Sequence, residues 1–87
     1  MYQKGKLIYE LLTEICKVFQ RDRDEILKNK NFEHIPLYEN PFYLNHIEFI
    51  YLLILCNDKY GLDFINSSRD KNVFYTINNI ADFINSN

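Results

Sequence analysis

The stretch from residue 45 to residue 64, NHIEFIYLLILCNDKYGLDF, is the most apolar run in the chain and does most to limit its fold. Apolar side chains recur in it at i, i+3, i+4, i+7 and i+11, the spacing that keeps one face of an α-helix apolar. These residues are Phe49, Leu52, Leu53, Cys56 and Tyr60. Asn40 or Asn45 is suited to cap the start of this helix, and Gly61 is suited to end it in the left-handed conformation. The stretch therefore predicts a central helix of at least four turns.

The opposite face of this helix is only partly polar, which leaves its surroundings open. It carries Glu48, Tyr51, Ile54, Leu55 and Asp58. A helix that is apolar on nearly all sides either lies within a core or has a second surface to cover. Two arrangements satisfy this requirement. The preceding loop folds over the face and buries it, or the face is exposed and binds a partner or a second copy of the chain.

The first third of the chain predicts one long helix and a short turn. Residues 6–20 form the helix, with an inward stripe of Ile8, Leu11, Leu12, Ile15, Val18 and Phe19. Asp22 or Asp24 then caps a turn that carries Ile26 and Leu27 into the core. Residues 28–43 follow as a long loop, because they include two prolines and show no periodicity.

The last third predicts a short helix and a final longer one. Ser67 or Ser68 is suited to cap a short helical turn that runs to Lys71. Thr76 caps the last helix, whose apolar residues recur with helical spacing from Ile77 to Ile84. Periodicity alone thus predicts a small all-α domain that spans residues 1–87, with residues 1–5 and 85–87 frayed.

Charge and composition exclude several classes of function. The 87 residues carry a formal net charge of −2, with acids and bases mixed, so neither nucleic acid nor an anionic membrane is an expected partner. The apolar part of the central run is interrupted after about ten residues, which is too short to span a bilayer. Cys16 and Cys56 each lie on an apolar helical stripe, and we expect free thiols in a reducing compartment. The expected location is the cytoplasm.

In order and spacing, these elements resemble the acyl carrier protein family. In that family the second helix opens with Asp-Ser-Leu and ends in a Phe/Tyr-Gly-Ile/Leu step. Here the matching segments are residues 45–47, Asn-His-Ile, and residues 60–62, Tyr-Gly-Leu. Residues 76–84 resemble the closing helix of the family, and the likeness extends over about residues 6–84. It implies an acyl-carrier-like four-helix bundle, with three longer helices, one short helix and a long loop between the first and second helices.

One departure from the family governs what the resemblance implies about function. The family serine carries the 4'-phosphopantetheine arm, whereas this chain has His46, flanked by Asn45 and Ile47, at that position. An imidazole does not form the phosphodiester that attaches the arm. The remaining hydroxyls lack the sequence context of an attachment site; they are Thr13, Ser67, Ser68, Thr76 and Ser86. We therefore expect no cofactor, no metal and no catalytic residue.

Three functions remain open. The first is a carrier-derived accessory protein that has lost its prosthetic group and binds a protein partner, such as a modifying enzyme of a peptide-maturation or natural-product system. Its partner-binding residues would be those of the partly polar face, Glu48, Tyr51, Ile54, Leu55 and Asp58. The second is a working acyl or peptidyl carrier that bears 4'-phosphopantetheine at an unusual site. The third is a small enzyme or metal-binding protein that uses His34 and His46 together with Glu33 or Glu48.

Overall fold

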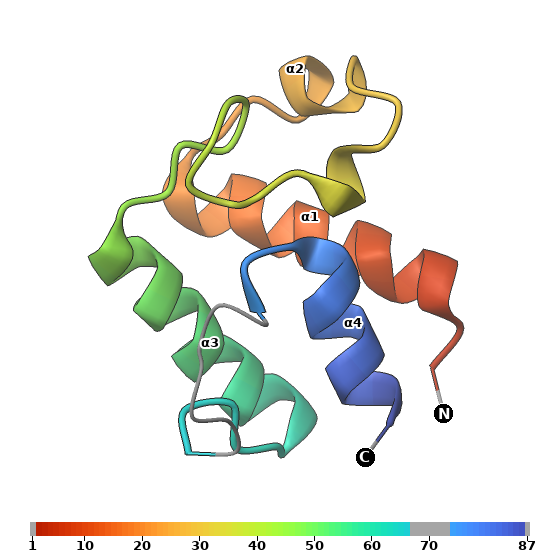
Figure 1. Ribbon diagram of the computed structural model, residues 1–87, viewed down its shortest axis with the longest axis vertical. Helices are drawn as coiled ribbons and strands as arrows, with labels where there is room; N and C mark the ends of the chain where they lie inside the picture. The colour runs from red at the N-terminus through yellow and green to blue at the C-terminus, as the bar shows by residue number, and fades with distance from the viewer. Residues whose placement is uncertain (1, 67–73, 87) are drawn as a thin grey trace.

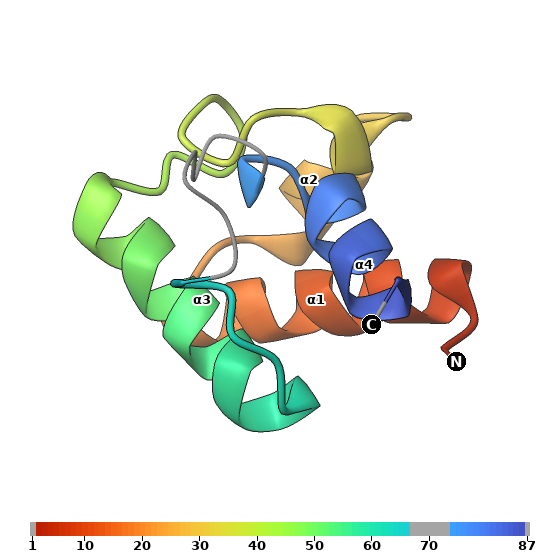
Figure 2. The ribbon, with the colours of Figure 1, turned by 60° about the horizontal axis from the view of Figure 1, so that its bottom comes forward.

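The computed structural model describes residues 2–66 and 74–86, and every regular element in these ranges is helical. The elements are α1 (Lys4–Phe19), α2 (Arg23–Leu27), the 3₁₀-helix η1 (Phe32–His34), α3 (His46–Tyr60) and α4 (Ile77–Asn85). In Figure 1 α1 runs across the molecule and α4 crosses it, whereas α3 lies at the lower left, apart from α4. The view turned by 60° shows the same crossing (Figure 2). The predicted all-α class is confirmed for the described residues. The short helix predicted from Ser67 or Ser68 to Lys71 lies outside them.

Helix α1 begins two residues earlier than predicted and ends one residue earlier. Lys4 opens it, and its Nζ lies 2.7 Å from Oδ1 of Asp82 at the far end of the chain. The backbone N–H of Tyr2 also donates to Oδ1 of Asn85 at 3.1 Å, so both terminal segments are tied together. At the other end Gln20 adopts a left-handed conformation with φ of 56° and is the C-cap of the helix, not its last residue.

Helix α2 corrects the prediction for the turn after α1. Asp22 caps it as one of the two predicted candidates, since its side chain accepts from the backbone N–H groups of Asp24 and Glu25. Ile26 is buried as predicted, but Leu27 is 37% exposed. The helix has only five residues, so a single turn directs one side chain inward. Leu27 lies about 100° further around the axis and points away from the core.

The core gathers apolar side chains from every element. On α1 the buried positions are Leu7, Ile8, Leu11, Leu12 and Ile15. The predicted stripe omitted Leu7, and its last two members, Val18 and Phe19, are only half-buried. Three phenylalanines that follow or precede α3, Phe42, Phe64 and Phe74, are among the largest fully buried side chains. Phe64 and Phe74 also pack against Phe83 of α4, with ring centroids 4.7 and 5.1 Å from the Phe83 ring. The non-helical segments therefore add to a core that the helices mainly supply.

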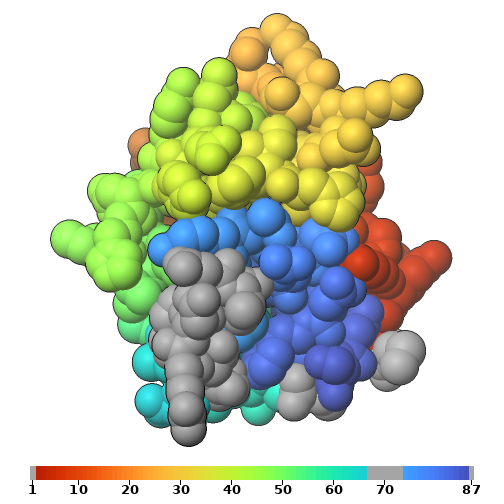
Figure 3. All heavy atoms as spheres, in the orientation of Figure 1, coloured from red at the N-terminus to blue at the C-terminus, as the bar shows by residue number. Residues whose placement is uncertain are grey.

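The long loop is held in place by backbone pairing. The N–H of Leu37 donates to the carbonyl of Tyr75 at 2.6 Å, and the N–H of Leu44 donates to the carbonyl of Leu37 at 2.9 Å. Leu37 thus connects the segment that precedes α3, at Leu44, with the segment that precedes α4, at Tyr75. In the space-filling view the loop lies directly against the start of the last helix (Figure 3). These bonds fix the position at which α3 begins.

Candidate functional site: the first turn of helix α3

The start of α3 is defined by reciprocal capping hydrogen bonds. Oδ1 of Asn45 accepts from the backbone N–H of Glu48 at 2.7 Å, and Oε1 of Glu48 accepts from the backbone N–H of Asn45 at 2.9 Å. This capping box selects Asn45 over Asn40 as the N-cap. His46 is therefore the first residue of the helix, and its side chain is exposed. At the other end Gly61 is the C-cap with φ of 67°, as predicted.

Arg21 fixes this turn to the rest of the molecule. Its guanidinium donates to the carbonyls of Phe19 at 2.5 Å, Phe42 at 2.6 Å and Tyr43 at 3.1 Å. Its Nη2 also donates to Oε1 of Glu48 at 3.1 Å. One cation thus binds the end of α1, the end of the loop and the first turn of α3. Oε1 of Glu48 accepts both from the backbone N–H of Asn45 in the capping box and from Arg21 in the ion pair. This carboxylate therefore already has partners within the fold.

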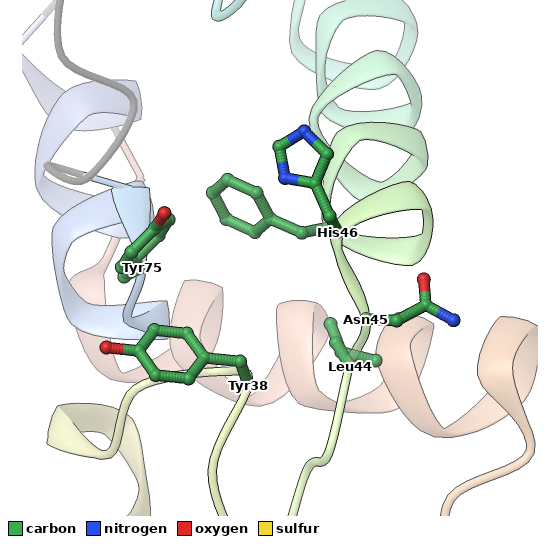
Figure 4. A pocket seen from close by; sticks show the side chains of 6 residues that line it. Tyr38, Leu44, Asn45, His46 and Tyr75 are labelled. Carbon is green, nitrogen blue, oxygen red and sulfur yellow. The ribbon is translucent and has the colours of Figure 1, made fainter.

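A pocket of about 310 Å³ opens beside the first turn of α3. Six of the described residues line it: Tyr38, Leu44, Asn45, His46, Phe49 and Tyr75. The rings of Phe49 and Tyr38 each meet the ring of Tyr75 nearly edge to face, with centroids 5.0 Å apart in both pairs. The close view shows the two tyrosines on one side of the pocket and His46 on the other (Figure 4). Sequence reasoning did not find this pocket, because Tyr38 and Tyr75 are far apart in the chain.

The partly polar face of α3 is open to solvent over much of its length. Tyr51 is 48% exposed and Ile54 is 44% exposed, Leu55 is half-buried, and Asp58 is exposed. The loop residues that would cover this face in the first arrangement, Tyr38 and Phe42, lie elsewhere. Phe42 is fully buried in the core, and the ring of Tyr38 packs on Tyr75. Of the two predicted arrangements, the exposed face is the one observed.

The prediction omitted the most exposed apolar residue of this face. Ile47 is 80% exposed and stands at i, i+4 and i+7 with Tyr51 and Ile54. At about 100° per residue these three side chains fall within roughly 60° around the helix axis. We refer to Ile47, Tyr51 and Ile54 as the α3 stripe. The spacing was visible in the sequence, but Ile47 was assigned only to the family motif that surrounds His46.

Burial raises the pKa of both cysteine thiols and of the Tyr60 phenol. Cys56 is 2% exposed, and burial raises the pKa of its thiol to about 12; Cys16 is half-buried, and burial also raises the pKa of its thiol. Both are free cysteines, as predicted. The pKa of Tyr60 is also raised, first by burial and then by the nearby carboxylate of Glu10. Among the described residues the hydroxyl of Tyr60 has no hydrogen-bond partner.

The predicted metal-binding alternative has no cluster in the described part of the chain. His34 is the last residue of η1, and His46 is the first of α3. Over residues 2–66 and 74–86, no three or more His, Cys, Asp or Glu side chains gather closely enough to hold a metal ion. Of the hydroxyls that were judged unsuitable for attachment, those of Ser67 and Ser68 lie outside these ranges. Thr76 is the N-cap of α4, and the hydroxyl of Thr13 donates to the carbonyl of Tyr9.

Comparison with known proteins adds no further constraint. No protein-family model, no curated protein and no solved structure matches this chain. In the two described ranges, none of the helices combines the length and the apolar character needed to cross a bilayer. The case for a function therefore depends on the residues and geometry described above.

Proposed function

We propose that this chain is an acyl-carrier-like protein that has lost its prosthetic-group attachment site and acts by binding a protein partner through the α3 stripe. The partner is a modifying or biosynthetic enzyme, as the family resemblance implies. The observation that carries this proposal is the position of His46. It is the first residue of a long, well-capped helix and is exposed there, which is where the resemblance would place the attachment serine.

The helix start would suit the arm chemically if a hydroxyl were present. The first N–H groups of a helix and its dipole favour a phosphate next to the first turn. Asn45 and Glu48 satisfy two N–H groups of this region and hold the turn in place. The imidazole of His46 leaves that geometry without an oxygen nucleophile. A loss of the arm, with the fold retained, is consistent with both observations.

The chemistry of the partner surface follows from the α3 stripe. In the carrier proteins that the chain resembles, the second helix is strongly acidic and is bound by basic patches on enzymes. On this chain Glu48 is already bound to Arg21, and Asp58 is the exposed acid of the predicted face. The exposed side chains between them are apolar or aromatic. The partner therefore presents an apolar surface, and the complex should depend only weakly on salt.

Intact mass spectrometry after co-expression with a promiscuous phosphopantetheinyl transferase tests the loss of the arm. We expect the mass of the wild-type chain to stay unchanged. The His46→Ser variant should gain one phosphopantetheine, since it restores a hydroxyl at the first position of α3. The His46→Ala variant is the matched control and should gain none. A wild-type chain that gained the arm would contradict the proposal and support a working carrier with an unusual site.

Partner binding is tested by substitution of the α3 stripe. An affinity purification from the native host, with bound proteins identified by mass spectrometry, would supply the partner. We expect Tyr51→Ser and Ile54→Ser to lose it, whereas Tyr9→Ser should retain it. Tyr9 is the matched control because it is equally exposed, at 48%, and lies on α1. Retention of the partner by both stripe variants would contradict the assignment of this surface.

A further inference from the structure

The pocket beside the first turn of α3 has the composition of a small-ligand site. Its floor is made by Leu44 and Phe49, which are 2% and 5% exposed and belong to the hydrophobic core. Its wall is made by Tyr38 and Tyr75, which come from the long loop and from the approach to α4. Its volume of about 310 Å³ lies at the lower end of the range for small-molecule pockets. Such pockets are mostly apolar, with a few polar groups at defined places.

The wall of this pocket comes from two loop segments, which a backbone hydrogen bond and ring contacts join. The hydrogen bond of 2.6 Å from the N–H of Leu37 to the carbonyl of Tyr75 joins the segments that carry the two tyrosines. The ring of Tyr75 is then held between Tyr38 and Phe49 by two edge-to-face contacts. A wall fixed in this way does not have to be ordered when a ligand enters, which lowers the entropic cost of binding.

The lining also limits the chemistry of the occupant. Among the residues that the structure describes, no Asp, Glu, Lys or Arg side chain lines the pocket, so none of them offers an ion-pair partner to a charged group. Three aromatic rings do line it, and aromatic pairs in edge-to-face or offset geometry contribute about 0.5–1.5 kcal/mol beyond the area that they bury. At the rim the imidazole of His46 can exchange a hydrogen bond with one polar substituent, whereas the side chain of Asn45 points away from the pocket (Figure 4) and its Oδ1 accepts from Glu48.

We infer that this pocket binds a small uncharged aromatic molecule that carries one hydrogen-bonding group, with its ring against Tyr38, Tyr75 and Phe49. This site is separate from the α3 stripe. Phe49 and Tyr51 differ by two residues, so their side chains point about 160° apart around the helix axis. The inference does not depend on the carrier resemblance, because it is derived only from the lining of the pocket.

Titration with indole, followed by ¹H–¹⁵N correlation spectra of the labelled protein, tests the inference. Indole has a flat uncharged ring system and one N–H donor. We expect saturable shifts concentrated at His46, Phe49 and Tyr75. Cyclohexanol is the control ligand, since it carries a polar group on an aliphatic ring; we expect it to bind at least about twofold more weakly, given the aromatic contribution. Equal binding of the two would overturn the assignment of an aromatic ligand.

Two matched tyrosine variants, one in the pocket and one on the α3 stripe, test where indole binds. Tyr38 is 52% exposed and Tyr51 is 48% exposed, so either side chain can be truncated with little effect on the core. Tyr38→Ala should weaken indole binding by about 3- to 10-fold, whereas Tyr51→Ala should leave it unchanged. Non-saturable shifts in the wild type, or equal losses in the two variants, would overturn the proposed site. Circular dichroism of each variant confirms that a loss of binding is not a loss of the fold.

Discussion

Nη2 of Arg21 lies 3.1 Å from Oε1 of Glu48, and this contact joins the end of one long helix to the first turn of the next. Both side chains are about three-quarters buried, at 24% and 26% exposure. We therefore predict that Arg21→Ala lowers the free energy of unfolding by about 2–3 kcal/mol, because three backbone carbonyls and one carboxylate lose a charged donor. Urea unfolding followed by circular dichroism measures this change.

A second arginine provides the control for this prediction. Arg23 donates to the hydroxyl of Thr13 at 2.8 Å and lies 6.0 Å from the ring centroid of Tyr9, but it is exposed. Exposed polar contacts of this kind contribute little, so Arg23→Ala should cost less than about 1 kcal/mol. Equal losses for the two variants would show that Arg21 does not hold the helices together. Arg21 was not predicted as a structural residue, since its partners at positions 42, 43 and 48 are distant in sequence.

The second prediction concerns the cap of α3. Asn45→Ala removes the oxygen that accepts from the N–H of Glu48, and it should lower the free energy of unfolding by about 1 kcal/mol. Asn45→Asp retains that acceptor and should restore most of the loss. Thermal unfolding of the three proteins gives the comparison. A stability of Asn45→Ala within about 0.2 kcal/mol of the wild type would contradict the role of the capping box.

The helices were predictable from the sequence because their evidence is local. The spacing of apolar residues, the cap at Thr76 and the stop at Gly61 each lie within a few residues of the helix that they define. The prediction was wrong for Leu27, where the short length of α2, and not the polarity of the residue, decides exposure. Of the two apolar residues at positions 26 and 27, only Ile26 points inward.

The pocket and the exposed face were harder to predict, because both depend on tertiary contacts. Nothing in the local sequence pairs Leu37 with Tyr75, yet that hydrogen bond brings Tyr38 to the pocket. The same bond helps to draw the loop toward α4 and away from the α3 stripe. The exposure of Tyr51 and Ile54 was therefore left open by the sequence and decided by the path of the loop.

The third prediction separates the two thiols. Thiolate is the form that reacts with alkylating reagents, and burial raises the pKa of Cys56 to about 12. At pH 8 iodoacetamide should therefore modify Cys16 in the folded protein and reach Cys56 only after unfolding. Peptide mapping of samples taken over time, with and without urea, measures the two rates. Faster modification of Cys56 than of Cys16 in the absence of urea would contradict the described burial.

The fourth prediction is the pH dependence that follows from the same thiol. The pKa of Cys56 is raised from 9.0 to about 12 on folding, so above pH 9 the unfolded chain releases a proton that the folded chain retains. The contribution of Cys56 to stability is full below pH 9 and is lost as the pH rises toward 12. We expect the free energy of unfolding to fall over this window. Cys56→Ala should reduce the slope, although Tyr60, whose pKa is also raised, leaves a remainder.

The fifth prediction compares the α3 stripe with the opposite side of the same helix. Ile47 is 80% exposed, so Ile47→Ser should change the free energy of unfolding by less than about 0.5 kcal/mol. Leu53 is fully buried, and Leu53→Ala should cost about 2–5 kcal/mol because it leaves a cavity. Urea unfolding of both variants measures the difference. A loss of more than about 1 kcal/mol for Ile47→Ser would show that the stripe is packed within the fold.

The two proposed sites share α3 but face away from each other, since Phe49 lines the pocket and Tyr51 belongs to the stripe. An aromatic guest and a protein partner would therefore not compete for space. Under the two proposals, a small molecule would lie on one flank of the helix and a protein partner on the other.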